Sequence, residues 1–112
     1  MKPFNFQRFY DCKRIRNRHI REPGLWLYVR RSNVYRSAKY GVLFDLANMT
    51  ADVPGKGALT AFLDAWEPKV GFFVESILNE RLVAYLLRRG YAFTNPKVEF
   101  SPDMYKRGPN EP

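Results

Sequence analysis

The sequence predicts an α/β domain whose elements follow in the order β-β-loop-α-β-α-β. Three observations carry this prediction. Two runs rich in β-forming residues come first, at 25–29 and 40–46. Two segments with helical spacing of apolar residues follow, at 59–66 and 80–89. A short apolar run at 70–74 lies between these helices, an arrangement that favours parallel strands joined by right-handed crossovers.

The N-terminal third carries the positive charge of the chain, whose formal net charge is +8. Residues 6–19 contain no Gly or Pro and are compatible with a short basic amphipathic helix. Pro23 and Gly24 break that segment before the first strand. The polar residues 30–39 are expected to form the hairpin connection to the second strand.

The first predicted helix is amphipathic. Its four largest apolar residues recur at i, i+3, i+4 and i+7, which places them on one face and predicts that they belong to the core. Pro68 ends this helix. The residues are Leu59, Phe62, Leu63 and Trp66.

The second predicted helix has clear start and stop signals. Asn79 is a suitable N-cap, and Gly90 follows two arginines in the last turn. Two short strands are expected next, at 91–94 and 97–100. The tail from Ser101 is expected to be extended or frayed.

Composition narrows the class of protein. Hydrophobic residues make up 46% of the chain, too many for a wholly disordered chain. Cys12 is the only cysteine and is expected to be a free thiol, so neither an internal disulfide nor a cysteine zinc site is expected. No apolar run approaches the ~18 residues of a membrane span, and no secretory signal is recognised, so we expect a cytoplasmic protein with no membrane partner. The expected organisation is one domain over 1–112, with a basic segment at 1–24, a core at 25–100 and an extended tail at 101–112.

The loop at 54–58 is the most informative motif. Gly55 and Gly57 allow a tight turn in which successive N–H groups point at one anion, and the start of the following helix adds to that field. Lys56 contributes a full positive charge. The motif is neither a Walker A loop nor a complete dinucleotide fingerprint. It predicts a phosphate or pyrophosphate site, with a ligand-free structural turn as the alternative.

Two segments resemble signature motifs of the GNAT-type N-acetyltransferases. The loop and Leu-rich helix at 54–63 resemble the Arg/Gln-x-x-Gly-x-Gly/Ala motif of that family, although Pro54 or Asp52 stands at its first position. The segment 79–91 resembles the family's helix that starts at Asn and ends in Gly-Phe. The resemblance covers about residues 41–94 and implies a GNAT-like twisted mixed sheet with flanking helices. Compact divergent proteins of this family occur in tailed phages, and this chain resembles them.

The resemblance implies that acetyl-CoA is the cofactor and lies in a wedge between two central strands. The pantetheine arm is then expected along 47–49, and the pyrophosphate on the amides of 55–59. The implied cofactor-binding residues are Met49, Gly55, Lys56, Gly57, Ala58, Leu59 and Asn79.

Acyl transfer to an amine needs a base and a proton source for the leaving thiolate. Asp45, on the strand that enters the wedge, is the first candidate base, and Glu75 is the second; the alternative for each is a solvent-facing strand charge. The family's thiolate-protonating Tyr aligns with Leu86, and Tyr85 is one position away. The implied acceptor is an amine-bearing small molecule or protein.

Two other functions stay open from the sequence. One is a catalytically inactive GNAT-like phage accessory or structural protein that binds a partner. The other is a basic nucleic-acid-binding module acting through residues 13–39, where Trp26, with Phe9 and Tyr10 nearby, could stack bases. For the basic cluster at 13–21, a solvated face is the alternative.

Overall fold

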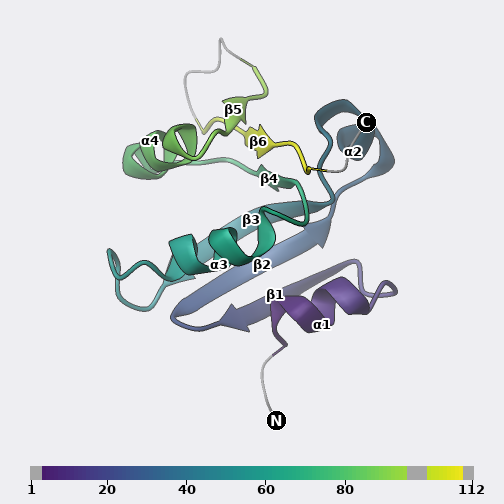
Figure 1. Ribbon diagram of the computed structural model, residues 1–112, viewed down its shortest axis with the longest axis horizontal. Helices are drawn as coiled ribbons and strands as arrows, with labels where there is room; N and C mark the ends of the chain where they lie inside the picture. The colour runs from purple at the N-terminus through teal and green to yellow at the C-terminus, as the bar shows by residue number, and fades with distance from the viewer. Residues whose placement is uncertain (1–3, 96–100, 110–112) are drawn as a thin grey trace.

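Six strands form one mixed sheet in the order β1-β2-β3-β4-β6-β5 (Figure 1). The computed structural model describes residues 4–95 and 101–109. Helices flank the sheet, so the predicted mixed α/β class is confirmed. The elements are α1 (Phe6–Asp11), β1 (Asn17–Glu22), β2 (Leu25–Arg31), α2 (Val34–Tyr40), β3 (Phe44–Ala51), α3 (Ala58–Trp66), β4 (Phe72–Val74), α4 (Glu80–Arg88), β5 (Ala92–Phe93) and β6 (Met104–Lys106).

The centre of the sheet holds its parallel pair. β3 and β4 pair in parallel and are joined through α3, as the sequence predicts. The hairpin β1–β2 and the pair β2–β3 are antiparallel, and so are β4–β6 and β5–β6. A short connection joins the antiparallel strands β1 and β2. The parallel strands β3 and β4 require a longer crossover, which α3 supplies.

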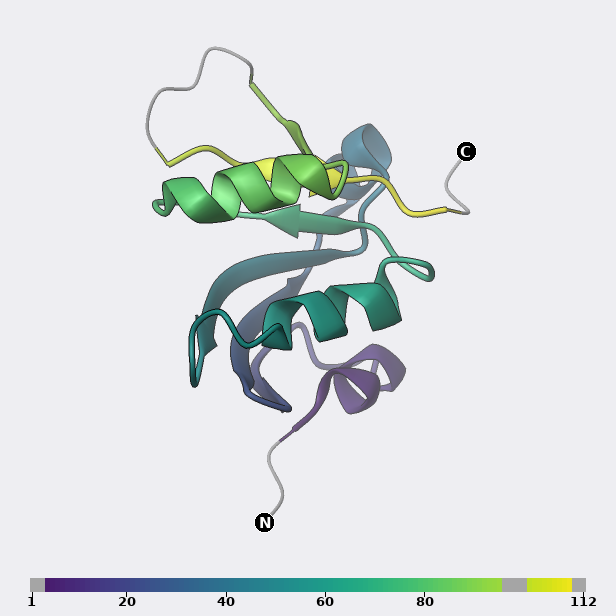
Figure 2. The ribbon, with the colours of Figure 1, turned by 60° about the vertical axis from the view of Figure 1, so that its left-hand side comes forward.

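α1 and α3 cover the same face of the sheet (Figure 2). Between them lies an aromatic cluster in which Phe6 packs against Phe44, Phe62, Trp66 and Phe72, with ring centroids 4.5–5.8 Å apart. Edge-on contacts dominate, the geometry that aromatic quadrupoles favour. The prediction that the apolar face of the first amphipathic helix forms core is confirmed for Phe62, Leu63 and Trp66.

The predicted N-terminal helix at 6–19 is too long. α1 ends at Asp11, and the chain then turns and enters β1, which pairs along its whole length with β2. Arg31 holds the turn, because its guanidinium donates to the main-chain carbonyls of Phe9, Cys12 and Ile15. Tertiary hydrogen bonds therefore override the local helical tendency of this segment.

The predicted hairpin connection at 30–39 is also wrong. β2 runs on to Arg31, and residues 34–40 form α2, capped by the Asn33 side chain, which accepts from the Arg36 N–H at 2.7 Å. Gly41, in the left-handed conformation, closes its C-terminal end. The returning strand consequently starts at Phe44 rather than at 40 and continues to Ala51.

The C-terminal tail is part of the sheet rather than frayed. β6 lies between β4 and β5, and its Met104 is fully buried. Gly71 and Gly108 let two backbone segments meet, since a Cβ added at Gly71 would lie 2.3 Å from the Gly41 carbonyl oxygen and 2.6 Å from the Gly108 nitrogen. The strand predicted at 91–94 is observed as β5, and the one predicted at 97–100 lies outside the described residues.

Cys12 is exposed and free, as predicted. No helix of the described residues is long and apolar enough to cross a membrane. Within the same part of the chain, no group of three or more His, Cys, Asp or Glu side chains is placed to hold a metal ion.

The predicted N-cap of α4 is confirmed. Asn79 Oδ1 accepts from the N–H groups of Arg81 at 2.8 Å and Leu82 at 3.4 Å. Asn79→Ala leaves these donors to water and is expected to lower the free energy of unfolding by about 1 kcal/mol. Urea denaturation measures this change. Asn79→Ser, which keeps a capping oxygen, is expected to lose much less, and equal losses would contradict the capping role.

Candidate functional site

The two parallel strands separate beyond their third residue pair and leave a hollow between them. Their pairing ends at Leu46 and Val74, while β3 continues along β2 to Ala51. The last hydrogen bond between the two strands runs from the Glu75 N–H to the Leu46 carbonyl, at 3.1 Å. The hollow has a volume of about 230 Å³ and is lined by Leu46, Ala47, Asn48, Met49, Val74, Glu75, Ser76, Ile77, Leu78, Asn79 and Leu82.

Local backbone features explain why the strands diverge. The β2–β3 register shifts at Ala47, which has no cross-strand partner, and such a bulge bends the strand that carries it. On the other side, Ser76 adopts a positive φ of 48° and turns the chain out of β4. Asp103 holds that turn, since its Oδ1 accepts from the Ser76 N–H at 2.8 Å. Asp103, the residue before β6, therefore stabilises one wall of the hollow.

A second hollow, of about 400 Å³, adjoins the first at Asn79 and Leu82, which line both. Its wall includes the glycine loop and the first turn of α3. Gly55 and Gly57 both have a φ of +79°, and a Cβ at either would meet nothing within 4 Å. The loop thus presents open space at the N-terminus of α3, where main-chain N–H groups are free to bind an anion.

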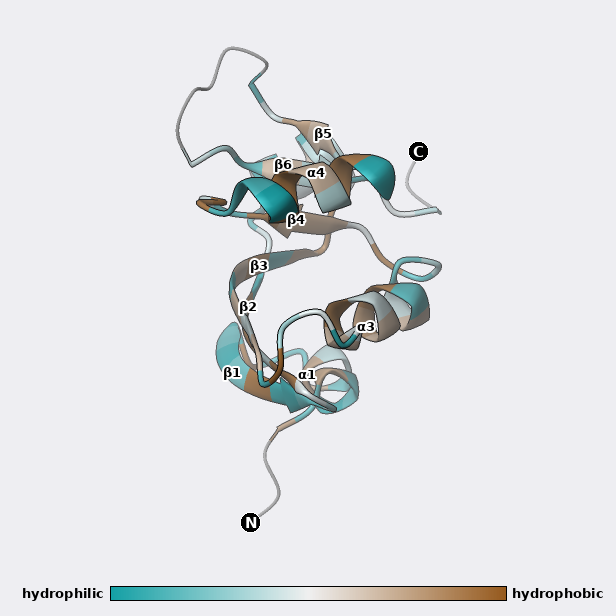
Figure 3. Cartoon of the chain, turned by 90° about the vertical axis from the view of Figure 1, so that its left-hand side faces the viewer, coloured by the Kyte–Doolittle hydropathy of each residue, from teal (hydrophilic) through white to brown (hydrophobic). Residues whose placement is uncertain are grey.

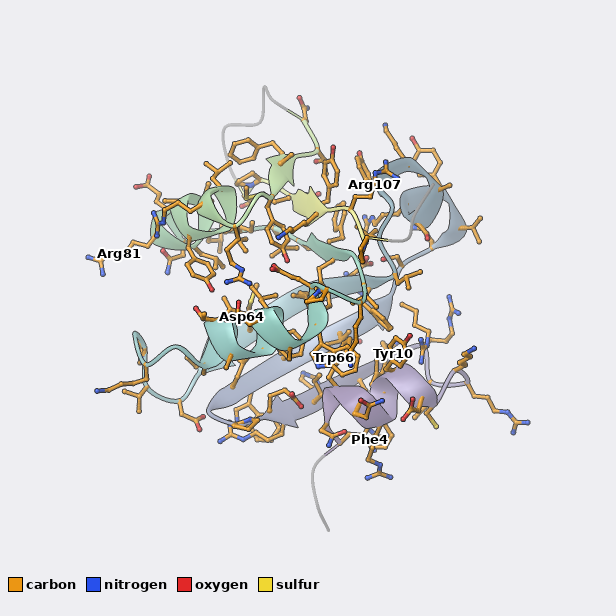
Figure 4. The ribbon with its side chains drawn as sticks, in the orientation of Figure 1. Phe4, Tyr10, Asp64, Trp66, Arg81 and Arg107 are labelled. Atoms are coloured by element: carbon orange, nitrogen blue, oxygen red, sulfur yellow. The ribbon has the colours of Figure 1, made fainter. Side chains whose placement is uncertain are left out.

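Three cationic side chains line this outer hollow: Lys56 from the loop, and Arg81 and Arg88 from α4. None of the three forms an ion pair with any described residue. Figure 4 shows Arg81 extending outward from the end of α4. Neither arginine was predicted from the sequence, although their spacing of seven residues on one helix face, close to Asn79, was a usable signal.

The acidic residue at the start of the loop is neutralised. Asp52 forms a two-point ion pair with Arg21 of β1, with one contact at 2.8 Å. The hydrogen bonds from Arg21 hold the pKa of Asp52 below its usual value. Its negative charge is therefore offset locally, and the potential at the loop is set by the three cations.

The candidate base Asp45 is not solvent-facing and does not line either hollow. It is 4% exposed and accepts hydrogen bonds from Ser32 Oγ at 2.6 Å and the Arg36 guanidinium at 2.8 Å. A buried carboxylate needs such partners. Glu75, the second candidate, does line the inner hollow, and its carboxylate binds Arg36 at 3.0 Å and also Arg30.

Tyr85 lies at the outer hollow, away from the end where β3 and β4 separate. Its hydroxyl and the Thr60 hydroxyl are 2.6 Å apart, which joins α4 to α3. Leu86, at the position aligned with the family's tyrosine, is fully buried in the core. Within α4, therefore, the hydroxyl stands on the side that faces the glycine loop.

Glu67 holds the two helices that form the outer hollow. Its carboxylate accepts from Arg89 at 2.7 Å, Tyr91 Oη at 2.8 Å and Lys106 at 3.3 Å. Burial opposes its ionisation, but the hydrogen bonds from Arg89 and Tyr91 outweigh burial, so the pKa of Glu67 lies below its usual value. Burial, together with the Glu67 charge, raises the pKa of Tyr91.

This network predicts a pH-dependent stability. Because the pKa of Glu67 is lowered on folding, its contribution is present above the unfolded pKa of about 4.3 and is lost as the pH falls through the folded value. Glu67→Gln is expected to cost about 2 kcal/mol at pH 7 and clearly less at pH 3. Urea denaturation at both pH values measures this, and an equal cost at both would contradict the assigned charge state.

The sequence-predicted cofactor residues line two adjoining hollows. Met49 lines the inner part, residues 55–59 line the outer part, and Asn79 lines both. Comparison of the chain with protein families, with curated proteins and with solved structures found no match.

Proposed function

We propose that this chain is an acyl-CoA-dependent N-acyltransferase of GNAT type. The observation that carries the proposal is the pair of adjoining hollows, one where the parallel strands β3 and β4 separate and one where the glycine loop opens α3. The strand order places this separation at the centre of the sheet, in keeping with the wedge that the family resemblance implies.

The cofactor's parts match the two hollows. The N–H groups of the glycine loop, with Lys56, Arg81 and Arg88, would hold the pyrophosphate. The edge of β3 at Met49 and Ala47 would hold the pantetheine arm. The thioester would then reach the inner end.

When bound there, acetyl-CoA would supply a thioester to a neutral amine. The amine nitrogen would bond to the acyl carbon, the C–S bond would break, and water would protonate the CoA thiolate that leaves. The amine's proton passes to a carboxylate, and Glu75 takes that role because it lines the hollow, whereas Asp45 does not. Asp45 and Arg36 position Glu75 through the ion pairs that the two carboxylates share with this arginine.

Glu75→Gln tests this assignment. It is expected to lower kcat for acyl transfer by at least about 100-fold, because a general base typically contributes that much, while KM for acetyl-CoA stays within a few-fold. Asp45→Asn is the comparison variant and is expected to retain more activity. Loss of activity in Asp45→Asn with full activity in Glu75→Gln would reverse the two roles.

The activity itself is tested with a panel of amines and acetyl-CoA, by following release of free CoA thiol. Saturating acetyl-CoA is expected to raise the Tm, since a ligand bound only by the folded state stabilises it. Absence of any thermal shift would contradict the proposal before an acceptor is sought.

A second candidate is a catalytically inactive domain that binds acyl-CoA or a partner. It is favoured by the arginines that occupy the Glu75 carboxylate and by the buried Leu86 at the position of the family's tyrosine. Acetyl-CoA binding without turnover on any amine distinguishes this candidate from the enzyme.

A further inference from the structure

The sheet has one face that the described helices leave largely open. α1 and α3 lie on the other side of β1 and β2 (Figure 3). Along these strands side chains alternate, so Ile20 and Leu27 enter the core and their neighbours point outward. Residues directly opposite each other on neighbouring strands share a face. The outward set, here called the open face, is His19 and Arg21 of β1, Trp26 and Tyr28 of β2, and Asn48 and Thr50 of β3.

The charge of the open face is compensated. Arg21 is its only lysine or arginine, and it forms a two-point ion pair with Asp52. Arg18 of β1 points to the other side, because it is paired in register with the core residue Val29. Its guanidinium lies 4.1 Å from the centroid of the Phe4 ring, which packs against the core. A surface without an unpaired lysine or arginine favours an uncharged ligand over a polyanion.

Two aromatic rings stand along the open face on β2. Trp26 is 44% exposed even though the Arg21 guanidinium lies 4.9 Å from the centroid of its ring. Tyr28 is half-buried, and its ring centroid lies 4.6 Å from that of His19. Alternate residues of one strand are roughly 7 Å apart, so the two rings form a short row along an extended line. The electron-rich faces of such rings attract the weakly positive C–H groups of a ligand.

Uncharged hydrogen-bonding groups surround this row. The side chains of Asn48 and Thr50 are exposed, each directly across the strand pair from one of the two rings. Within the described part of the chain, neither side chain hydrogen-bonds to another residue, and the same holds for Trp26 Nε1 and the Tyr28 hydroxyl. Together these groups offer both donors and acceptors. A ligand that covers them must supply hydrogen bonds, because burying a polar group without one costs free energy.

We propose that the open face binds an uncharged, extended oligosaccharide, with sugar rings stacked on Trp26 and Tyr28. A sugar ring carries C–H groups on its faces and hydroxyl groups around its rim, so it matches the aromatic rings and the polar groups together. An apolar peptide would leave the polar groups unpaired, and a nucleic acid strand would leave its phosphates without cations. The inference does not rest on acyl transfer, and its test contains no acyl-CoA.

The test is a calorimetric titration of the purified chain with two extended β-linked tetrasaccharides, cellotetraose and its N-acetylated amino counterpart, chitotetraose. For at least one of them we expect a dissociation constant of roughly 0.1–1 mM, because a flat, exposed face encloses little of its ligand. Maltotetraose, the α-linked isomer of cellotetraose, curls and cannot follow an extended strand, so it is expected to bind at least about 5-fold more weakly than the better β-linked ligand.

Variants of the open face separate the contribution of the rings from that of the polar groups. Trp26→Ala is expected to weaken binding at least about 10-fold, whereas Trp26→Phe, which keeps a ring, stays within about 3-fold of the unaltered chain. Thr50→Val keeps the side-chain shape but removes the hydroxyl, and is expected to weaken binding about 3- to 5-fold. Phe93→Ala is the matched control, expected to bind unchanged. Phe93 is an exposed strand ring, but it pairs with the buried Met104 and so lies on the helix-covered face.

Two further readouts follow. Trp66 is buried, so a fluorescence change on binding is expected to come from Trp26 and to disappear in Trp26→Phe. Because the ligand is uncharged, its affinity is expected to be the same at about 50 and 500 mM salt.

Three results would overturn the proposal. The first is no saturable binding of either β-linked tetrasaccharide up to about 10 mM. The second is binding that Trp26→Ala leaves unchanged, which would place the sugar elsewhere. The third is binding that Thr50→Val leaves unchanged while Trp26→Ala abolishes it, which would mean that the face recognises rings without hydroxyl groups.

Discussion

Phe6→Ala is expected to lower the free energy of unfolding by about 3–5 kcal/mol, the largest loss we anticipate from one substitution in this chain. Phe6 is fully buried, and its ring lies between α1, α3 and the sheet. It contacts the rings of Phe44, Trp66 and Phe72, and no described side chain can fill the space without moving. Without the Phe6 ring, part of the apolar face of α3 would be left uncovered.

Chemical denaturation measures this loss, with Phe93→Ala as the matched control. Phe93 lies on β5 and is 36% exposed, so its replacement is expected to cost about 1 kcal/mol or less. A small effect of Phe6→Ala would mean that the N-terminal segment does not contribute to the core. Figure 4 places a second contact of this kind beside it, where Tyr10 of α1 and Trp66 of α3 lie together with ring centroids 5.3 Å apart.

Replacing Lys56, Arg81 and Arg88 together with Gln is expected to weaken acetyl-CoA binding roughly 30- to 100-fold. Each exposed cation contributes modestly to holding a phosphate, because solvent screens it, but all three line the same hollow. The glycine loop stays intact in this variant, so the effect reports charge rather than backbone shape. Calorimetry measures the dissociation constant.

The control variant replaces Lys13, Arg14 and Arg16 with Gln. It removes the same net charge from exposed positions outside the hollow, and its affinity for acetyl-CoA is expected to be unchanged within about 3-fold. Equal weakening in both variants would show that net charge, and not the site beside the glycine loop, controls binding.

Elements with a continuous apolar face were predictable from the sequence, and polar or short ones were not. α3 has apolar residues at helical spacing, and α4 begins at the capping residue Asn79. Both helices are observed. α2 has no buried residue, so it leaves no periodic apolar signal, although Asn33 and Gly41 mark its ends. β1 contains only one buried side chain, Ile20, and is a strand because β2 pairs with it.

The candidate site was predictable where it depends on one continuous segment. The glycine loop and Asn79 are local motifs, and the structure brings them to the same hollow. Arg81 and Arg88 join them only because α4 packs beside α3. The partners of Asp45 could not be foreseen, because Arg36 belongs to α2, the helix that the polar sequence did not indicate.

The most direct test of the proposed acyl-CoA site is a calorimetric titration of the purified chain with acetyl-CoA, with desulfo-CoA and ATP as comparison ligands. We expect one site of micromolar affinity, shared by acetyl-CoA and desulfo-CoA, and clearly weaker binding of ATP, which has phosphates but no pantetheine arm for the space along β3. No binding of acetyl-CoA, or binding that ATP matches, would contradict it: the glycine loop would then be only a turn or a general phosphate site.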